Sequence, residues 1–246
     1  MSAPAQPPRL PIIDVLRGFA IAQMVAYHFI YDLSYFRWLE LAMNRDQPWV
    51  AWRTAIVTQF LLLVGVSLVL RTTFKPSAAD FWRRWLQVAA AAGLVSIGSW
   101  LMFRERFIFF GILHFVVAAL ILTRPLLQLG PWLLVPGALA VVAGVLIRDD
   151  FFLQNGWNLT GFGSRKPRTE DWVPLFPWLG VVLLGAGLAS LWRDRAWHVP
   201  AVVSALNAPS TSPIRALRWI GQWPLTIYLV HQPILIGMLW LIRQWV

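Results

Sequence analysis

Four ionisable side chains lie at helical spacings in the first long apolar stretch of this 246-residue chain: Asp14, Arg17, His28 and Asp32. Asp14 and Arg17 are three residues apart and can form an ion pair on one helix face. Arg17 and His28 are eleven residues apart, or three turns plus about 20°, so they share that face at a separation of roughly 16 Å. Asp32 follows His28 by one turn, and its carboxylate can hold one imidazole N–H and fix the tautomer. The pattern predicts a histidine that serves as a base or a nucleophile.

Each of these side chains also has a structural interpretation. The Asp14–Arg17 pair can stabilise one end of the helix, Asp32 can be solvated, and a buried histidine can simply bond a backbone carbonyl. The carboxylate one turn after His28, and the arginine on the same face, favour the functional interpretation of His28.

Two more histidines lie in apolar stretches, His114 and His231, and Tyr228 and Gln232 lie close to the second. We expect these four side chains to line a cavity with His28. No two histidines are three or four residues apart and the chain has no cysteine, so no metal site is predicted.

The composition predicts that these residues lie in a membrane. Hydrophobic residues make up 58% of the chain and charged residues only 13%, against about one-quarter in soluble domains. The missing cysteines exclude a disulfide scaffold, a zinc–thiolate site and a cysteine nucleophile. A net charge of +10 is typical of nucleic-acid binding in a soluble protein. Here the basic residues are scattered between apolar runs, so we expect a lipid bilayer and no nucleic acid as partner.

The fold expected is an all-α polytopic membrane bundle, because the chain holds several runs of about 20 mostly apolar residues. Seven such spans are predicted, at 11–31, 51–70, 85–103, 107–123, 131–147, 173–192 and 223–242. A shorter apolar stretch at 199–206 is expected at the interface, or in a broken span that would be the eighth. Residues 1–10 are then a short tail, and 11–246 form one integral membrane domain.

The direction of the first span follows from the charged residues around it. The span holds Asp14 and Arg17 and no small-residue cleavage site follows it, so we expect it to remain in the mature protein. Basic loop residues divide evenly between the two sides, but only Asp80 and Asp194 among the loop acids lie on the side of the N-terminus. We therefore expect a cytoplasmic N-terminus.

Several segments resemble the heparan-alpha-glucosaminide N-acetyltransferase-like bacterial membrane proteins, which belong to a wider transmembrane acyltransferase superfamily. The first segments are RLPIIDVLRG at 9–18 and YHF at 27–29, with Asp32 following. The Arg17-x10-His28 spacing is also similar to the motif of the acyltransferase-3 proteins. Further matches follow in order: FGILH at 110–114, DWVPLFPWLG at 171–180 and YLVHQP at 228–233.

This resemblance implies an enzyme that transfers an acyl group across a membrane. The donor would be a cytosolic acyl-CoA, usually acetyl-CoA, and the acceptor a hydroxyl or amine of a sugar or glycan on the far side. A membrane histidine is the implied catalytic residue, and His28 matches its place. The predicted spans are fewer than in the lysosomal enzyme and no lumenal domain is expected, so the acceptor cannot be carried over from that enzyme. If the chain is bacterial, heparan is not the expected acceptor. The implied location is a bacterial inner membrane.

The expected roles follow from position. His28 would be a general base or a transient acyl carrier, oriented by Asp32, while Arg17 would contact the donor or remain tied to Asp14. His114 and His231 would line the passage or donate to the tetrahedral oxyanion.

Asp171 and Trp178, at the predicted outer mouth of the sixth span, would hold the sugar by a hydrogen bond and a stacked ring. The alternative for Trp178 is anchoring in lipid.

Two other classes of protein remain open on the sequence. Intramembrane His, Asp and Arg also serve as proton relays in transporters, although the chain is small and shows no internal repeat. A non-catalytic membrane subunit would use the same histidines for packing.

Overall fold

The computed structural model describes residues 10–74, 77–154, 156–194 and 212–245. These residues divide into two compact units, one drawn from 1–60 and 199–246 and the other from 61–198. The described residues are mainly helical and contain no strand, apart from an isolated parallel bridge between Phe110 and Trp172. The predicted all-α class is therefore confirmed.

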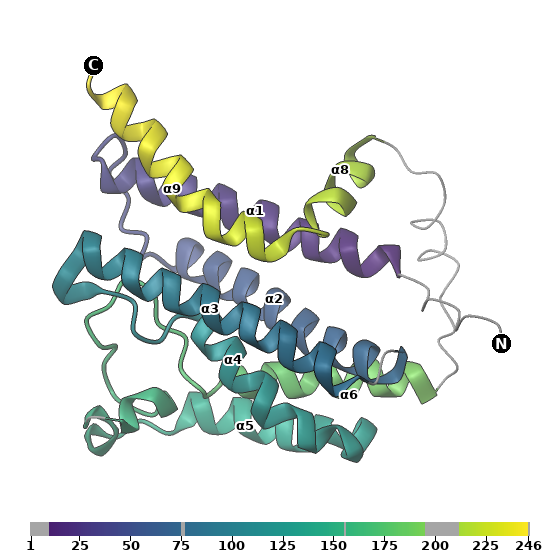
Figure 1. Ribbon diagram of the computed structural model, residues 1–246. Helices are drawn as coiled ribbons and strands as arrows, with labels where there is room; N and C mark the ends of the chain where they lie inside the picture. Colours follow the sequence, from purple (N-terminus) through teal and green to yellow (C-terminus); the bar gives the residue numbers. More distant parts are fainter. Residues whose placement is uncertain (1–9, 75–76, 155, 195–211, 246) are drawn as a thin grey trace. The chain divides into compact units, whose positions relative to one another are not determined.

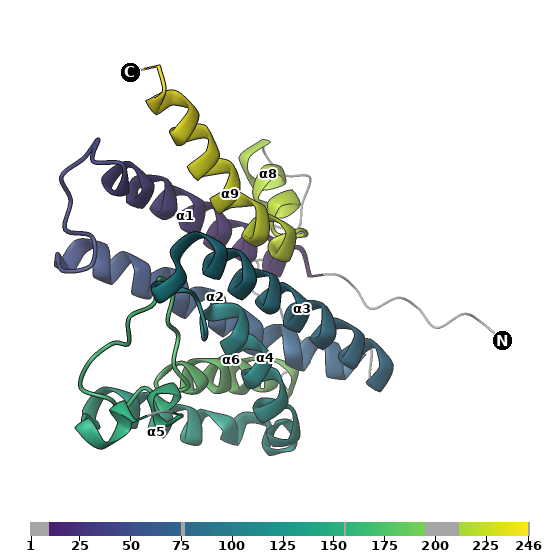
Figure 2. The same ribbon diagram turned by 60° about the vertical axis from the view of Figure 1, so that its left-hand side comes forward.

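The first unit is built on the N-terminal helix, against which the two C-terminal helices pack (Figure 1 and Figure 2). Its elements are α1 (Pro11–Tyr35), the part of α2 (Gln47–Phe74) up to residue 60, α8 (Ser212–Ile220) and α9 (Pro224–Arg243). A proline stands at the start of both α1 and α9, where the missing N–H would have no helical partner. The core of this unit consists of Ile21, Met24, Tyr27, Met43 and Ile56.

Two glycines allow α1 and α8 to approach closely. A Cβ atom on Gly18 would collide with the backbone carbonyl of Leu217 in α8. One on Gly221, just after α8, would collide with the carbonyl of Asp14. Small residues at helix contacts are common in membranes, because association there depends on close packing.

The second unit contains the remaining helices and the loops between them. Its elements are the rest of α2, α3 (Ala78–Phe103), η1 (Arg104–Arg106), α4 (Ile112–Thr123), η2 (Arg124–Leu133), α5 (Leu134–Leu146), η3 (Asp150–Leu153), η4 (Trp157–Thr160) and α6 (Trp178–Asp194). Most of α6 is buried, and it packs against α5 and η2. The core is formed by Val69, Leu133, Leu183, Ala186 and Ala189.

Five stretches of the described chain are long and apolar enough to cross a bilayer. They are Pro11–Tyr35, Gln47–Phe74, Ala78–Arg106, Ile112–Leu146 and Pro224–Arg243. The count of seven is not confirmed, because two predicted spans, 107–123 and 131–147, both overlap a single stretch, Ile112–Leu146. Within that stretch, Gly130 has non-helical φ and ψ angles of 54° and −129°.

The predicted sixth span also differs from the structure. Helix α6 begins only at Trp178 and has 17 residues, fewer than the roughly 20 that a crossing needs. The residues before it bond to a distant segment instead, since the Val173 amide donates to the Phe110 carbonyl over 3.2 Å. The apolar stretch at 199–206, and residues 1–9 of the predicted tail, lie outside the described residues.

Candidate functional site

In the first unit, His28 of α1 contacts His231 of α9. The His28 Nδ1 and His231 Nε2 atoms are 3.0 Å apart, and the ring centroids are 4.9 Å apart at an angle of 47°. His231 is 6% exposed, whereas His28 remains partly accessible. The two histidines are 203 residues apart in the sequence, so helical periodicity could not predict that they meet.

The second ring nitrogen of His231 faces its own helix. Nδ1 lies 2.7 Å from the Tyr228 carbonyl and 3.2 Å from the Ile227 carbonyl, one turn earlier. The Tyr228 ring also packs against the His231 ring at 5.7 Å between centroids. His231 is therefore held in one orientation by its own backbone while it bonds His28.

Asp32, one turn after His28 in α1, meets Gln232, which directly follows His231 in α9. Asp32 is 2% exposed, and its Oδ1 accepts from Gln232 Nε2 over 3.3 Å. No hydrogen-bond donor among the described residues reaches Asp32 Oδ2 or Gln232 Oε1, although both oxygens are buried. The predicted Asp32–His28 bond is not among the hydrogen bonds found between described side chains, since α9 supplies a separate partner to each of the two.

Arg17 links the start of α1 to the turn between α8 and α9. Its NH1 donates to Asp14 Oδ1 over 2.9 Å and to the Gly221 carbonyl over 3.1 Å. The ion pair expected from the i,i+3 spacing is present. The bond to Gly221 has no counterpart in the sequence pattern, although the glycine itself marks the turn.

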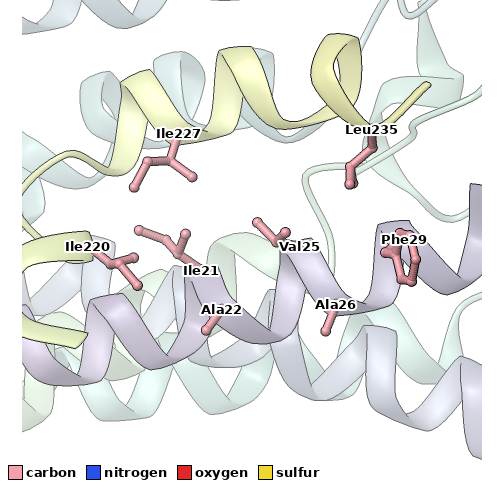
Figure 3. Close-up of a pocket in the computed structure, with 8 residues that line it drawn as sticks. All are labelled: Ile21, Ala22, Val25, Ala26, Phe29, Ile220, Ile227 and Leu235. Atoms are coloured by element: carbon pink, nitrogen blue, oxygen red, sulfur yellow. The ribbon is translucent and has the colours of Figure 1, made fainter. Parts of the chain in front are cut away.

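The same unit has an apolar groove lined by residues of α1, α8 and α9. Figure 3 shows side chains from α1 facing side chains from α8 and α9 across it. The groove has a volume of about 450 Å³ and is lined by Ile21, Ala22, Val25, Ala26, Phe29, Ile220, Ile227 and Leu235. Its wall offers hydrocarbon contacts and almost no polar ones.

His114 belongs to the second unit and is bonded through both ring nitrogens. Nδ1 accepts from the Gly111 amide over 3.3 Å, and Nε2 is 2.9 Å from Ser96 Oγ. Ser96 in turn donates to the Ile108 carbonyl over 2.6 Å. This chain of bonds stabilises the turn that leads into α4, and Ser96 is a member that sequence reasoning did not single out.

Asp171 supports the same turn. Its Oδ2 accepts from the Ile112 amide over 2.9 Å, at the N-terminus of α4. A Cβ on Gly111 would meet this carboxylate, so the glycine makes room for it. The two sequence segments around Gly111 and Asp171 are thus side by side, whereas Trp178 stands partly exposed at the first residue of α6.

The described residues contain no group of three or more His, Asp or Glu side chains that could hold a metal ion. The arrangement in the first unit instead offers an imidazole pair and two buried oxygens without donors. These groups can move a proton and accept hydrogen bonds.

The helical membrane architecture and the histidine pair define a membrane protein with acid–base groups in its spans. Residues 9–233 match the family model described as Heparan-alpha-glucosaminide N-acetyltransferase, catalytic. This match covers most of the chain, so the protein belongs to that family of membrane acetyltransferases. No curated protein and no solved structure matches the chain.

Proposed function

We propose that the protein transfers an acetyl group from acetyl-CoA to a hydroxyl or amine of a sugar or glycan, with His28 as the general base. The observation that carries this proposal is the His28–His231 contact on two apolar helices of a chain in this family. The expected setting is a bacterial inner membrane with a cytoplasmic N-terminus, so that donor and acceptor approach from opposite faces.

The reaction needs one base and no covalent intermediate. His28 takes the proton of the acceptor O–H or N–H as that atom attacks the thioester carbonyl carbon. The carbon–sulfur bond breaks when the tetrahedral intermediate collapses, and the departing CoA sulfur takes the proton back from the imidazolium. The products are the acetylated acceptor and free CoA, and His28 returns to its starting state.

The acceptor would bond to Asp32 and Gln232. Their buried oxygens without donors are both acceptors, and an unsatisfied buried polar atom costs about 1–3 kcal/mol. Hydroxyl and amine groups supply the donors that such oxygens need. Asp171 caps the turn before α4 and Trp178 begins α6, and neither is assigned to the acceptor in this proposal.

On the donor side, we assign Arg17 to the phosphates or the pantetheine amide of acetyl-CoA. A guanidinium is positively charged and suits phosphate recognition, and Arg17 precedes His28 by eleven residues on α1. His114 is bonded to Ser96 and Gly111 and receives no catalytic role in this proposal.

The deciding experiment supplies radiolabelled acetyl-CoA and a cell-envelope glycan extract to the purified protein. Wild type should transfer label, and His28→Ala should lose transfer by about 10²–10⁴-fold. Trp245→Ala, at an exposed position, is the control for handling and reconstitution. Transfer that survives His28→Ala excludes the base role, and proton-coupled solute uptake without transfer would indicate a transporter.

Donor binding has its own test. Millimolar CoA should raise the melting temperature of the wild-type protein, and Arg17→Ala should abolish that shift. If CoA leaves the melting temperature of wild type unchanged, the donor assignment is wrong.

A further inference from the structure

We infer that His231 sets the tautomer of His28, so that the proton sits on His28 Nδ1 and Nε2 is the nitrogen that takes the acceptor's proton. The use of that lone pair rests on the proposed function, whereas the tautomer itself follows from the hydrogen bonds around the two rings. His231 is then a positioning residue that acts through His28.

The argument begins at His231 Nδ1. This atom is within hydrogen-bonding distance of two backbone carbonyls, those of Tyr228 and Ile227. A carbonyl oxygen only accepts hydrogen bonds. His231 Nδ1 must therefore carry a proton and donate it.

The state of His231 Nε2 follows. In a neutral imidazole one nitrogen is a donor and the other an acceptor, so a proton on Nδ1 leaves a lone pair on Nε2. A doubly protonated His231 would bury a positive charge at a side chain that is 6% exposed. Such a charge is costly without a carboxylate partner, and the atom facing Nε2 is a nitrogen of His28. The neutral form is therefore the one that the site favours.

His28 Nδ1 lies 3.0 Å from that lone pair. Two lone pairs would repel at this distance, so Nδ1 must carry a proton and donate it to His231.

The remaining nitrogen of His28, Nε2, then holds the lone pair. When it takes a proton, the resulting imidazolium still donates through Nδ1 to His231, which keeps the ring in place. In serine hydrolases a buried carboxylate performs this task, and here a neutral imidazole held by its own backbone does so. Without the His231 acceptor, the proton of neutral His28 can move to Nε2, where it blocks the base.

Two substitutions at position 231 separate this role from packing. His231→Phe keeps an aromatic ring and removes the acceptor, while His231→Gln restores an acceptor oxygen near the original Nε2 position. We expect His231→Phe to lower kcat at least about tenfold with little change in KM for acetyl-CoA, since a well-placed base contributes about 10²–10⁴-fold. His231→Gln should recover most of that loss.

The tautomer can be read without any turnover. The chain has only four histidines, so ¹⁵N-histidine NMR of the protein in lipid nanodiscs resolves each ring, with His28→Ala to assign its signals. Wild-type His28 should be protonated at Nδ1 and bare at Nε2. His231→Phe should shift the proton toward Nε2, and His231→Gln should return it. The His114 signals, with a proton on Nε2, serve as an internal control for the fold.

Opposite results would overturn the inference. A wild-type His28 protonated at Nε2 contradicts it, and so does an unchanged kcat in folded His231→Phe. A protein that transfers no acetyl group but shows the expected tautomers leaves the inference standing and refutes the proposed function.

Discussion

His114 in the second unit and His28 in the first are both hydrogen-bonded to other groups. They differ in how many ring nitrogens these bonds use. His114 uses Nδ1 to accept from Gly111 and Nε2 to bond Ser96. His28 bonds His231 through Nδ1, and in our proposal its Nε2 takes the substrate proton. The difference shows that a membrane histidine has to be judged by its unused nitrogen and not by its position in an apolar run.

The reason for the difference lies in where each histidine stands on its helix. His114 is in the first turn of α4, where backbone N–H groups have no helical partners and a side chain can cap them. His28 is in the interior of α1, where the backbone is already bonded. Its ring bonds a partner on another helix, and α9 supplies that partner.

Asp171 in the second unit and Asp32 in the first differ in the same way, in the hydrogen bonds that they make. Asp171 in the second unit caps the Ile112 amide, a structural bond at a helix end. Asp32 in the first unit bonds Gln232 and keeps a buried oxygen that no described donor reaches. The first unit therefore carries the chemistry in our proposal, and the second unit's polar residues hold a turn.

The largest expected effect separates the two histidines. His28→Ala should reduce acetyl transfer by about 10²–10⁴-fold with little change in melting temperature. His114→Ala should instead lower the melting temperature clearly, because it leaves the Gly111 amide without its acceptor and removes the bond to Ser96. Transfer rates per folded molecule and thermal melting in detergent check both. If the two variants lose activity and stability to the same extent, the distinction between a catalytic His28 and a structural His114 is wrong.

The next effect concerns the two aspartates. Asp32→Asn should lower kcat/KM for the acceptor by about 10- to 100-fold, because hydrogen bonds to charged groups contribute about 1.5–3 kcal/mol. KM for acetyl-CoA should stay unchanged, as steady-state kinetics with both substrates varied will show. Asp171→Asn is the matched change in the second unit. If Asp32→Asn and Asp171→Asn lower kcat/KM for the acceptor equally, the assignment of the acceptor contact to Asp32 is wrong.

A third effect tests whether close helix packing holds the first unit together. Gly18→Ala should destabilise the protein by about 1–3 kcal/mol, because overpacking forces backbone shifts where the new Cβ meets the Leu217 carbonyl. Gly237→Ala in α9 is the control, since its Cβ would meet nothing within 4 Å. That change should be neutral or stabilise the helix by up to about 1 kcal/mol. Equal melting temperatures for the two variants would contradict the packing argument.

The smallest expected effect is on stability, from removing a helix cap in the second unit. Asp171→Ala should lower the free energy of unfolding by about 0.5–2 kcal/mol, as loss of a cap does elsewhere. Glu105→Ala, at an exposed position in η1, should change it much less. Denaturation monitored by tryptophan fluorescence measures both. If Asp171→Ala leaves the free energy of unfolding unchanged, Asp171 is not a stabilising cap. The role in acceptor binding that its sequence position suggested would then explain it better.

The sequence by itself determined the features that depend on composition and local spacing. Few charges and long apolar runs predict a helical membrane protein, and the i,i+3 spacing predicts the Asp14–Arg17 pair, because both follow from solvent and from helix geometry. The motifs around His28 and His231 also indicated the acetyltransferase family that residues 9–233 match.

Only the tertiary structure decided which partner each of these side chains has. Helical periodicity relates residues a few positions apart, so it paired His28 with Asp32, whereas α9 brings in His231 and Gln232 from about 200 positions away. The same limit applies to the spans, since hydropathy cannot tell that the residues before Trp178 bond the segment around Phe110. The helix contacts that position the proposed base arise from packing, and packing is a property of the folded chain.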